Sequence, residues 1–371
     1  MEITFTTFAE LKDELISFLN KYEPESLIVC PTEKVKVLKP KSERSCRFCG
    51  RSFPETTFNK ESHIIPHLLG NKYYISDFEC DSCNSFFGKF ENDLAYFLGI
   101  VRTIQGVSSK NKKVPTFKSP GDLLIAKRTE LHGVSDGVKI DLNDPSIVGL
   151  KINHETGESR IKFTKQPYVP LNVYKAFLKI ALSIIPSKYV EDYRKAYQLL
   201  INNSSSLAIF ANIVVYELPL EHKVGAPVCF LFKKKVGAEK VITHIFSLYF
   251  QNTIFQFTLP LFEEDINIGM YDGNTYSIPM CPPLLLIEPE PSSNYSRELK
   301  NFSSLESTKE EAVILFYCDP STLKNLMAFD PNTGTYSETT LDSDEIVSIF
   351  IAPVNSKMTF TNDQDDKQED I

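Results

Sequence analysis

The chain has 371 residues, of which 42% are hydrophobic and 24% are charged, a composition typical of globular proteins. No stretch approaches the roughly 18 apolar residues of a membrane helix, and Met1 to Leu11 lacks the basic and apolar regions of a secretory signal. Length and composition therefore disfavour a membrane or exported protein and favour a soluble, cytoplasmic one with two or three domains.

The net charge of -8 is unevenly distributed along the chain. Lys34 to Lys118 holds 15 Lys and Arg against 8 Asp and Glu, whereas the remaining residues hold 25 against 40. One basic segment on an otherwise acidic chain is the distribution expected of a phosphate-binding module. The charge pattern thus points to a nucleic-acid partner for this segment alone.

The first predicted element is a short amphipathic helix between Thr7 and Pro24, where apolar residues recur at helical spacing and Thr7 is placed to cap the helix. The Lys-rich stretch Pro31 to Ser45 predicts a linker or an exposed strand. Gly106 to Gly121 combines Lys, Ser, Gly and Pro, which is typical of a solvated basic loop.

Beyond Gly121 the pattern predicts a mixed α+β region. Apolar residues at 173–185 lie on one helical face, and a second long helix is expected after Pro186 with Ser187 as its cap. Runs of β-branched and aromatic residues predict strands at 123–126, 138–142, 160–163, 207–218, 228–232, 241–250 and 254–259. Thr361 to Ile371 is polar and acidic, and a disordered tail is expected there.

Two C-x-x-C pairs, Cys46/Cys49 and Cys80/Cys83, are separated by 30 residues. Four thiolates at such spacing form a closed tetrahedral site that suits structural zinc and leaves no position for water or substrate. The other cysteines are isolated and are expected in the core: Cys30, Cys229, Cys281 and Cys318.

The segment between the two pairs contains Glu61-Ser62-His63-Ile64-Ile65-Pro66-His67, and Asn84 directly follows Cys83. The order C-x-x-C, His-Ile-x-Pro, C-x-x-C-Asn resembles the zinc-containing branch of the HNH endonuclease family, over roughly residues 46–98. The resemblance implies a small ββα-metal, treble-clef-like module. A strand over 58–65 would carry His63, a turn would span 80–83, and a helix would follow over 84–98.

The resemblance also implies a mechanism, the hydrolysis of phosphodiester bonds in DNA. His63 would be the general base that takes a proton from water, and a Mg²⁺ or Mn²⁺ ion would stabilise negative charge on the phosphate. Asn84 matches the middle Asn of the family motif, which orients the loop or the metal. The third position falls on Glu91 or Asn92, and Glu91 is preferred because a carboxylate is the better ligand for a hard cation.

One position departs from the family pattern. Many members carry Asp or Glu directly before the base histidine, where this chain has Ser62. Glu61 lies one step earlier and would point to the opposite face of a strand unless a bulge turns it. The sequence therefore leaves Glu61, Glu91 and Asn92 open as ligands of the catalytic metal. Gly88, on the helix face of Asn84 and Glu91, is expected to allow close approach to the strand or to a phosphate.

The sequence predicts four regions: residues 1–33 as a helix and linker, 34–121 as the nuclease module, 122–360 as an α+β domain, and 361–371 as the tail. The α+β domain could be a sensor that gates the nuclease, a target-recognition domain or a scaffold for a homo-oligomer. Analogy with similar fusions suggests bacterial defence or mobile-element biology. The alternative function is a zinc module that binds nucleic acid or protein without cutting. Contacts to DNA are predicted from Lys60, His67, Lys89, Lys110, Lys112 and Lys113.

Overall fold

The computed structural model describes residues 4–33, 38–109, 113–131, 134–144, 149–238, 241–271, 279–286, 294–318, 326–330, 335–339 and 346–352. The chain forms two compact units, one of Met1–Ala95 with Tyr168–Thr308 and one of Tyr96–Pro167 with Lys309–Ile371. Both contain mixed secondary structure, which confirms the predicted α+β class. The domain limits predicted from the sequence, such as 121/122, are not limits of these units and stay a prediction.

The first unit is built on a six-stranded antiparallel sheet in the order β1-β10-β11-β12-β9-β13. Its four inner strands are rich in β-branched and aromatic residues, which favour a pleated, buried surface, whereas most residues of the two edge strands are partly or fully exposed. Their bounds are β1 Tyr22–Val29, β9 Asn212–Glu217, β10 Val228–Lys234, β11 His244–Phe250, β12 Thr253–Thr258 and β13 Ser296–Asn301.

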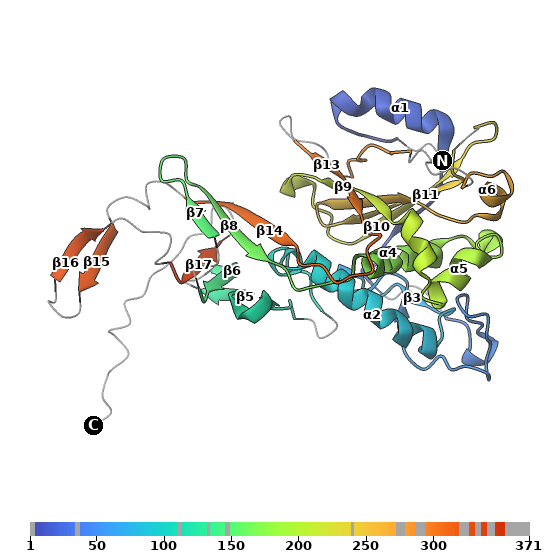
Figure 1. Cartoon of the computed structure of the whole chain (residues 1–371), viewed down its shortest axis with the longest axis horizontal. Helices are drawn as coiled ribbons and strands as arrows, with labels where there is room; N and C mark the ends of the chain where they lie inside the picture. The colour runs from blue at the N-terminus through green and yellow to red at the C-terminus, as the bar shows by residue number, and fades with distance from the viewer. Residues whose placement is uncertain are drawn as a thin grey trace. The chain divides into compact units, whose positions relative to one another are not determined.

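Helices cover both faces of this sheet (Figure 1). On one face lies α1, Lys12–Lys21, whose Phe18 packs edge-on against Phe232 of β10. On the other lies α4, Pro170–Ile184, where Phe177 contacts Phe255 of β12 at a ring distance of 4.6 Å. All residues of α4 except Asn172 are buried, because it also packs under the segment that carries the two cysteine pairs.

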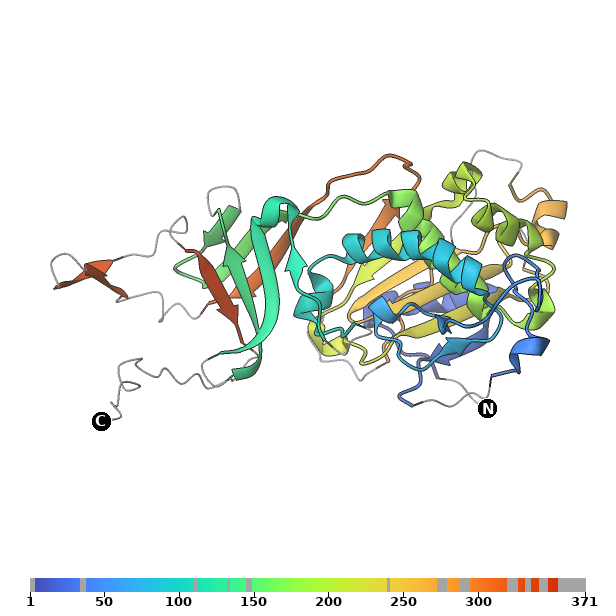
Figure 2. The same ribbon diagram turned by 90° about the horizontal axis from the view of Figure 1, so that it is seen from below.

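The segment with the cysteine pairs follows β1 in the chain and precedes the other five strands of the sheet. It lies against α4, as the view from below shows (Figure 2). It contains the two-residue strands β2, Ser62–His63, and β3, Ile75–Ser76, which pair antiparallel. It ends in α2, Asp81–Leu98, whose Phe87, Phe90 and Leu94 are buried. Other short elements of this unit are η1 Ala9–Leu11, η2 Lys41–Glu43, η3 His67–Leu69, η5 Ser187–Tyr189, α5 Arg194–Ile201, η6 Ser205–Phe210, η7 Leu220–His222 and α6 Glu263–Asn267.

The second unit is mainly β-structure around a core that includes Leu124, Ile140, Ile161 and Ile314. It holds a four-stranded sheet in the order β17-β6-β5-β4, a three-stranded sheet in the order β14-β8-β7, and the β15-β16 pair. The bounds are α3 Val101–Ile104, β4 Phe117–Lys118, η4 Pro120–Asp122, β5 Leu124–Leu131, β6 Val134–Leu142, β7 Gly149–Ile152, β8 Glu158–Thr164, β14 Glu311–Tyr317, β15 Leu326–Asp330, β16 Thr335–Thr339 and β17 Ser348–Ile351.

Several predicted elements differ from the observed ones in their limits. Thr7 does not cap α1, since its hydroxyl donates to the Pro283 carbonyl and the helix starts at Lys12 after a 3-10 turn. The strand predicted at 58–65 is reduced to Ser62–His63, because loop contacts replace the ladder on either side. The second long helix is only the eight-residue α5, and Ser187 begins a 3-10 turn.

Other predicted strands keep their positions but change their length. The run at 207–218 is a 3-10 turn followed by β9. The run at 228–232 forms the first five residues of β10, and the run at 254–259 contains all of β12 except Thr253. The predicted tail, Thr361 to Ile371, lies outside the described residues. No helix in the described part of the chain is long and apolar enough to cross a membrane.

Candidate functional site

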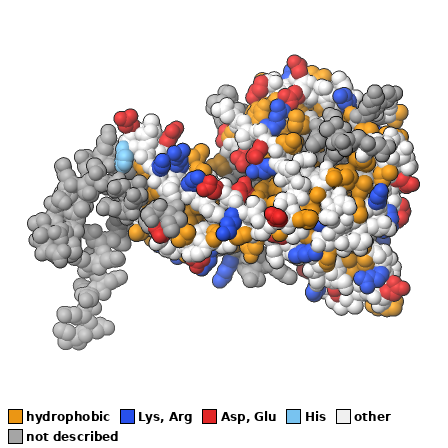
Figure 3. Space-filling view, in the orientation of Figure 1, with side chains coloured by type: hydrophobic (Ala, Val, Ile, Leu, Met, Phe, Trp, Pro, Cys, Tyr) orange, Lys and Arg blue, Asp and Glu red, His pale blue; other side chains and the backbone are white. Residues whose placement is uncertain are grey.

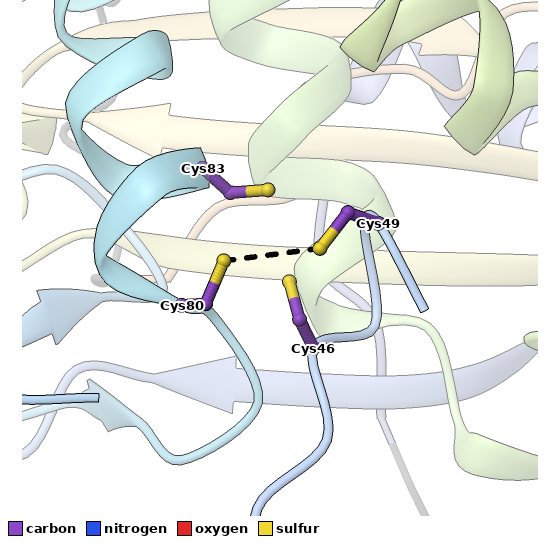
Figure 4. A group of neighbouring side chains, drawn as sticks. All are labelled: Cys46, Cys49, Cys80 and Cys83. Atoms are coloured by element: carbon purple, nitrogen blue, oxygen red, sulfur yellow. Dashed lines mark hydrogen bonds between the residues drawn. The ribbon is translucent and has the colours of Figure 1, made fainter. Parts of the chain in front are cut away.

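The four cysteines of the C-x-x-C pairs converge on one point (Figure 4). Cys46 and Cys49 come from a tight loop, Cys80 directly precedes α2, and Cys83 lies in its first turn. The four Sγ atoms lie within 4.8 Å of one another, and 3.8 Å separates those of Cys49 and Cys80. Zn–S bonds of about 2.3 Å in a tetrahedron require S–S distances of about 3.8 Å. The donor set therefore fits a structural zinc ion.

Local backbone geometry prepares the first cysteine pair. The Gly50 amide donates to the Cys46 carbonyl at 2.8 Å, and the Cys46 amide donates to the Arg51 carbonyl at 2.8 Å. Gly50 has a φ of 75°, a conformation that a side chain disfavours. A hydrogen bond from Cys83 lowers the pKa of the Cys46 thiol to about 5. The same hydrogen bond raises the pKa of the Cys83 thiol, so it favours the thiolate at Cys46 at the expense of Cys83.

The residues between these two cysteines face away from the thiol cluster and into the first unit. Phe48 is buried and packs edge-on against Phe87 of α2 and Tyr197 of α5. Arg47 donates to the carbonyls of Ser183 and Ile185 at 3.1 and 3.0 Å, at the C-terminal end of α4. The cysteine loop is therefore held by the later part of the chain as well as by its own turn.

His63 lies at the end of β2, and its imidazole is half-buried. Ser62 pairs with Ser76 and His63 with Ile75, so consecutive side chains point to opposite faces. Ser62 is buried toward the backbone of Glu79, whereas His63 faces His67 at a ring distance of 4.9 Å. His67, the predicted DNA contact, begins the 3-10 turn that follows Pro66 and is half-buried.

Asn71 fixes the loop that joins β2 to β3. Its side-chain amide donates to the carbonyls of Ile65 and Tyr74 at 2.7 and 3.0 Å, and its oxygen accepts from the amides of Tyr73 and Tyr74. The residue is fully buried, so each of these bonds replaces one to water. Asn71 therefore holds the loop that orients His63 and His67, a role that the sequence argument assigned to no residue here.

A buried lysine from α4 contacts the backbone of His63. The Lys179 ammonium donates to the His63 carbonyl at 2.8 Å and lies 3.0 Å from Oε2 of Glu79. Burial raises the pKa of Glu79, and Lys179 opposes that shift. Burial likewise raises the pKa of Glu91 on α2, again opposed by the charge of Lys179. His63, Glu79, Glu91 and Lys179 thus belong to one electrostatic neighbourhood.

The other predicted catalytic and metal-binding residues lie on or near α2. Asn84 and Glu91 are half-buried, whereas Asn92 and Glu61 are exposed. Asn84 lies one helical turn after Cys80, and its backbone N–H donates to the Cys80 carbonyl. Among the described residues, no group of His, Cys, Asp and Glu besides the four cysteines brings three ligand atoms this close. These side chains remain predicted ligands of the catalytic metal.

Gly88 lies on the helix face that carries Asn84 and Glu91. The sequence predicted that a glycine here lets the helix approach either the strand or a phosphate closely. The prediction is wrong for the strand, which does not approach this position. A Cβ added at Gly88 would have no heavy atom within 4 Å outside its own helix. The space above α2 is therefore open at the point where a phosphate was expected.

The predicted DNA contacts are mostly exposed. The Lys60 ammonium donates to the Ser85 hydroxyl at 2.9 Å, and Lys89 lies over the Phe86 ring at 4.2 Å. Lys113 is exposed in the second unit, and Lys110 and Lys112 lie outside the described residues. On the face shown in Figure 3, basic and acidic side chains are interspersed. The positive charge counted along the sequence is thus not a continuous patch on that face.

The segment described above was compared with known protein families. Residues 46–94 match the family model described as HNH endonuclease. The match confirms the resemblance predicted from the cysteine pairs, His63 and Asn84, and it identifies an HNH module near the N-terminus. No curated protein and no solved structure matches the chain. The module supports a nuclease-like function at the level of the family.

Arg47, Asn71 and Lys179 were not found by sequence reasoning. Arg47 lies inside a C-x-x-C pair, where the two intervening residues follow no rule, so nothing in the sequence distinguished it from a basic surface residue. Asn71 follows Gly70, and that pair is a signal for a turn rather than for a fully bonded amide. Lys179 lies in an otherwise apolar helical run. A lysine in such a run is rarely buried without a partner, and this was the signal that could have indicated a buried ion pair.

Proposed function

We propose that the HNH module is a metal-dependent endonuclease that hydrolyses phosphodiester bonds in DNA. The observation that carries this proposal is the placement of His63 within the segment that matches the family. The His63 ring is half-buried, its backbone is held by β3 and Lys179, and it faces His67. A base must be held in place to take a proton from an attacking water, and this arrangement supplies such support.

His63 is assigned as the general base, since a neutral imidazole accepts a proton near pH 7. A bound Mg²⁺ or Mn²⁺ ion would stabilise the negative charge that develops on the phosphate and on the leaving oxygen. Asn84 and Glu91 are assigned to hold that ion. Glu91 is preferred to Glu61 and Asn92 because it is half-buried and shares the electrostatic neighbourhood of His63, whereas the other two are exposed.

DNA binding is assigned to exposed basic residues and to the open surface of α2. Lys60, Lys89 and Lys113 would neutralise phosphates, His67 would contact the strand beside His63, and Gly88 leaves room over the helix. Lys110 and Lys112 stay in this proposal on the strength of their sequence position alone. Gating by residues 122–360, homo-oligomer formation through them, and a place in bacterial defence or mobile-element biology are further proposals, which rest on analogy.

The decisive experiment is cleavage of supercoiled plasmid DNA by purified protein with Mg²⁺ or Mn²⁺. His63→Ala should lower the rate by about 100- to 10,000-fold, the range for loss of a general base, with little change in melting temperature. His154→Ala is the matched control, since His154 is an exposed histidine between β7 and β8. Equal rates for His63→Ala and wild type would refute the assignment of the base.

A second function, binding of nucleic acid or protein without cleavage, is favoured by one observation. Ser62 replaces the acid that many family members carry before the base, and its side chain is buried toward Glu79 rather than toward His63. The plasmid assay separates the two functions when it is paired with a DNA-binding measurement. Binding that His63→Ala leaves intact, in wild-type protein that cuts no DNA with either ion, would favour the non-cutting module.

A further inference from the structure

Helix α4 lies outside the segment that matches the HNH family, yet that segment contacts both of its ends. At the N-terminal end, Asp93 of α2 accepts hydrogen bonds from the Val169 amide at 2.9 Å and from the Asn172 side chain at 2.8 Å. At the other end, Arg47 donates to the last carbonyls. An acid at the start and a base at the end of a helix both stabilise its dipole.

The third contact, in the middle of α4, is the ammonium of Lys179. The side chain is 2% exposed and that of its partner Glu79 is 0% exposed, so both charges are removed from water. A buried ion pair is not by itself strong evidence for stability, because desolvation offsets much of the attraction. The ammonium, however, also donates to the His63 carbonyl at 2.8 Å. This bond couples α4 directly to the residue assigned as the base.

The backbone around His63 is held by strand pairing and by a fixed loop as well as by Lys179. Strand β2 is two residues long and its ladder with β3 contains two residue pairs. Asn71 fixes the loop that follows at Ile65, two residues beyond His63. The bond from Lys179 therefore acts at the residue itself, where it restrains the peptide that follows the His63 Cα and so the backbone that carries the imidazole.

We propose that Lys179 is a positioning residue for His63, holding the base through its backbone carbonyl from a helix that the HNH module itself does not contain. The proposal rests on the proposed function for its effect on rate, but its effect on the His63 ring does not. It gives α4 a part in the active site that residues 46–94 alone cannot supply. An isolated HNH segment would lack this support.

The chain provides a matched comparison in Lys175, one helical turn earlier on α4. Lys175 is as buried as Lys179, and its ammonium donates to the Asn203 side chain at 2.8 Å and lies 5.7 Å from the Phe90 ring centre. Replacement of Lys175 therefore removes a buried cation and a hydrogen bond without touching His63 or Glu79. It measures what a buried lysine of α4 contributes to stability alone.

Three variants of the full chain test the proposal. Lys179→Met removes the bond but leaves Glu79 buried without its cation, and it may be compared only if folded. The double variant Lys179→Met/Glu79→Gln removes that unpaired charge and keeps the protein testable. Lys175→Met is the control. Each is measured for melting temperature, for DNA affinity, for single-turnover cleavage at saturating DNA with Mn²⁺, and for the ¹⁵N-histidine NMR signals of His63.

The double variant should melt close to wild type, bind DNA within about twofold, and cleave about 10- to 100-fold more slowly, because small misplacement of a catalytic group costs about that much. Its His63 signals should shift, whereas Lys175→Met should change only the melting temperature. Unchanged His63 signals in the double variant would overturn the proposal. Wild-type protein without cleavage but with shifted His63 signals in the double variant would refute the nuclease and leave the positioning role standing.

Discussion

The cysteine cluster and the site around His63 lie in the same HNH module but are assembled differently. The four thiols come from one tight loop and from the start of α2, all within one segment, and the turn at Gly50 shapes the first pair. The site at His63 takes its parts from β2, α2 and α4, and Lys179 lies 116 residues beyond the residue it contacts. The cysteine cluster takes all its ligands from one segment, whereas the site at His63 takes its contacts from segments far apart in the chain.

This difference has a consequence for how each site can fail. Loss of one ligand from a metal cluster removes the ion that organises the whole segment. Loss of one contact around His63 that leaves no buried charge unpaired is expected to keep the fold and to change local geometry. Mutations in the two sites should therefore separate into those that unfold the module and those that slow the reaction.

The largest effect is expected for Cys80→Ser, which removes one of four thiolates. Structural zinc sites contribute on the order of 10 kcal/mol of binding free energy to folding, so the module should unfold and the protein should lose its zinc. Metal content and thermal unfolding are the measurements. Cys318→Ser, which changes a half-buried thiol of the second unit, is the control. A folded, zinc-free Cys80→Ser protein with native melting temperature would contradict the structural role.

A divalent ion that exchanges independently of zinc is expected to control cleavage. Chelation mild enough to leave zinc in place should abolish plasmid cleavage, and added Mg²⁺ or Mn²⁺ should restore it, because that ion supplies the charge stabilisation. Zinc content measured on the same samples is the control. Undiminished cleavage by protein that holds zinc but no exchangeable divalent ion would contradict this prediction. It would mean that cleavage needs no metal other than the zinc.

Glu91→Gln is expected to have a smaller effect than loss of a metal ion, since it alters a single predicted ligand. Cleavage should slow by about 100-fold and need a higher concentration of Mn²⁺, as loss of a carboxylate from a metal site costs a few kcal/mol. Glu61→Gln is the matched control, because Glu61 is exposed. The reverse pattern would assign the ligand to Glu61 and place Glu91 outside the site.

Arg47→Met tests the contact between the cysteine loop and α4 and should have the smallest effect. Charge-assisted hydrogen bonds to carbonyls contribute roughly 1.5–3 kcal/mol, so the free energy of unfolding should fall by about that amount. Zinc should remain bound, since Arg47 faces away from the thiols toward Ser183 and Ile185. Denaturant unfolding with metal analysis measures both, and zinc loss at native stability would be the contrary result.

The sequence predicted the parts of the molecule that are encoded by short-range patterns. The cysteine pairs, the order of their motif and the apolar face of α2 are each visible within about forty residues, and all are observed. Strands such as β10 and β12 were likewise marked by their composition. The predicted ends of helices and strands were less accurate. Long-range contacts such as that of Thr7 with Pro283 change where a helix begins or ends, and no nearby residue signals them.

Long-range pairings could not be predicted in the same way. Nothing near residue 63 indicates that its carbonyl will meet Lys179, and nothing near residue 93 indicates that Asp93 will bind the start of α4. Such contacts appear only when the sheet, α4 and α2 are stacked. The contacts that hold the segment around His63 were therefore missed, whereas the family motif itself was recognised.

The position of α4 in the chain also sets the order in which the site can be completed during synthesis. The cysteines, His63 and Glu91 all precede residue 95, whereas Lys179 follows about 90 residues later, roughly 5–20 s of translation at bacterial and eukaryotic rates. A nascent chain can thus gather its thiols well before α4 leaves the ribosome. Until then His63 lacks its contact with Lys179, so a truncated product would carry the recognisable motif without the hydrogen bond to the His63 carbonyl.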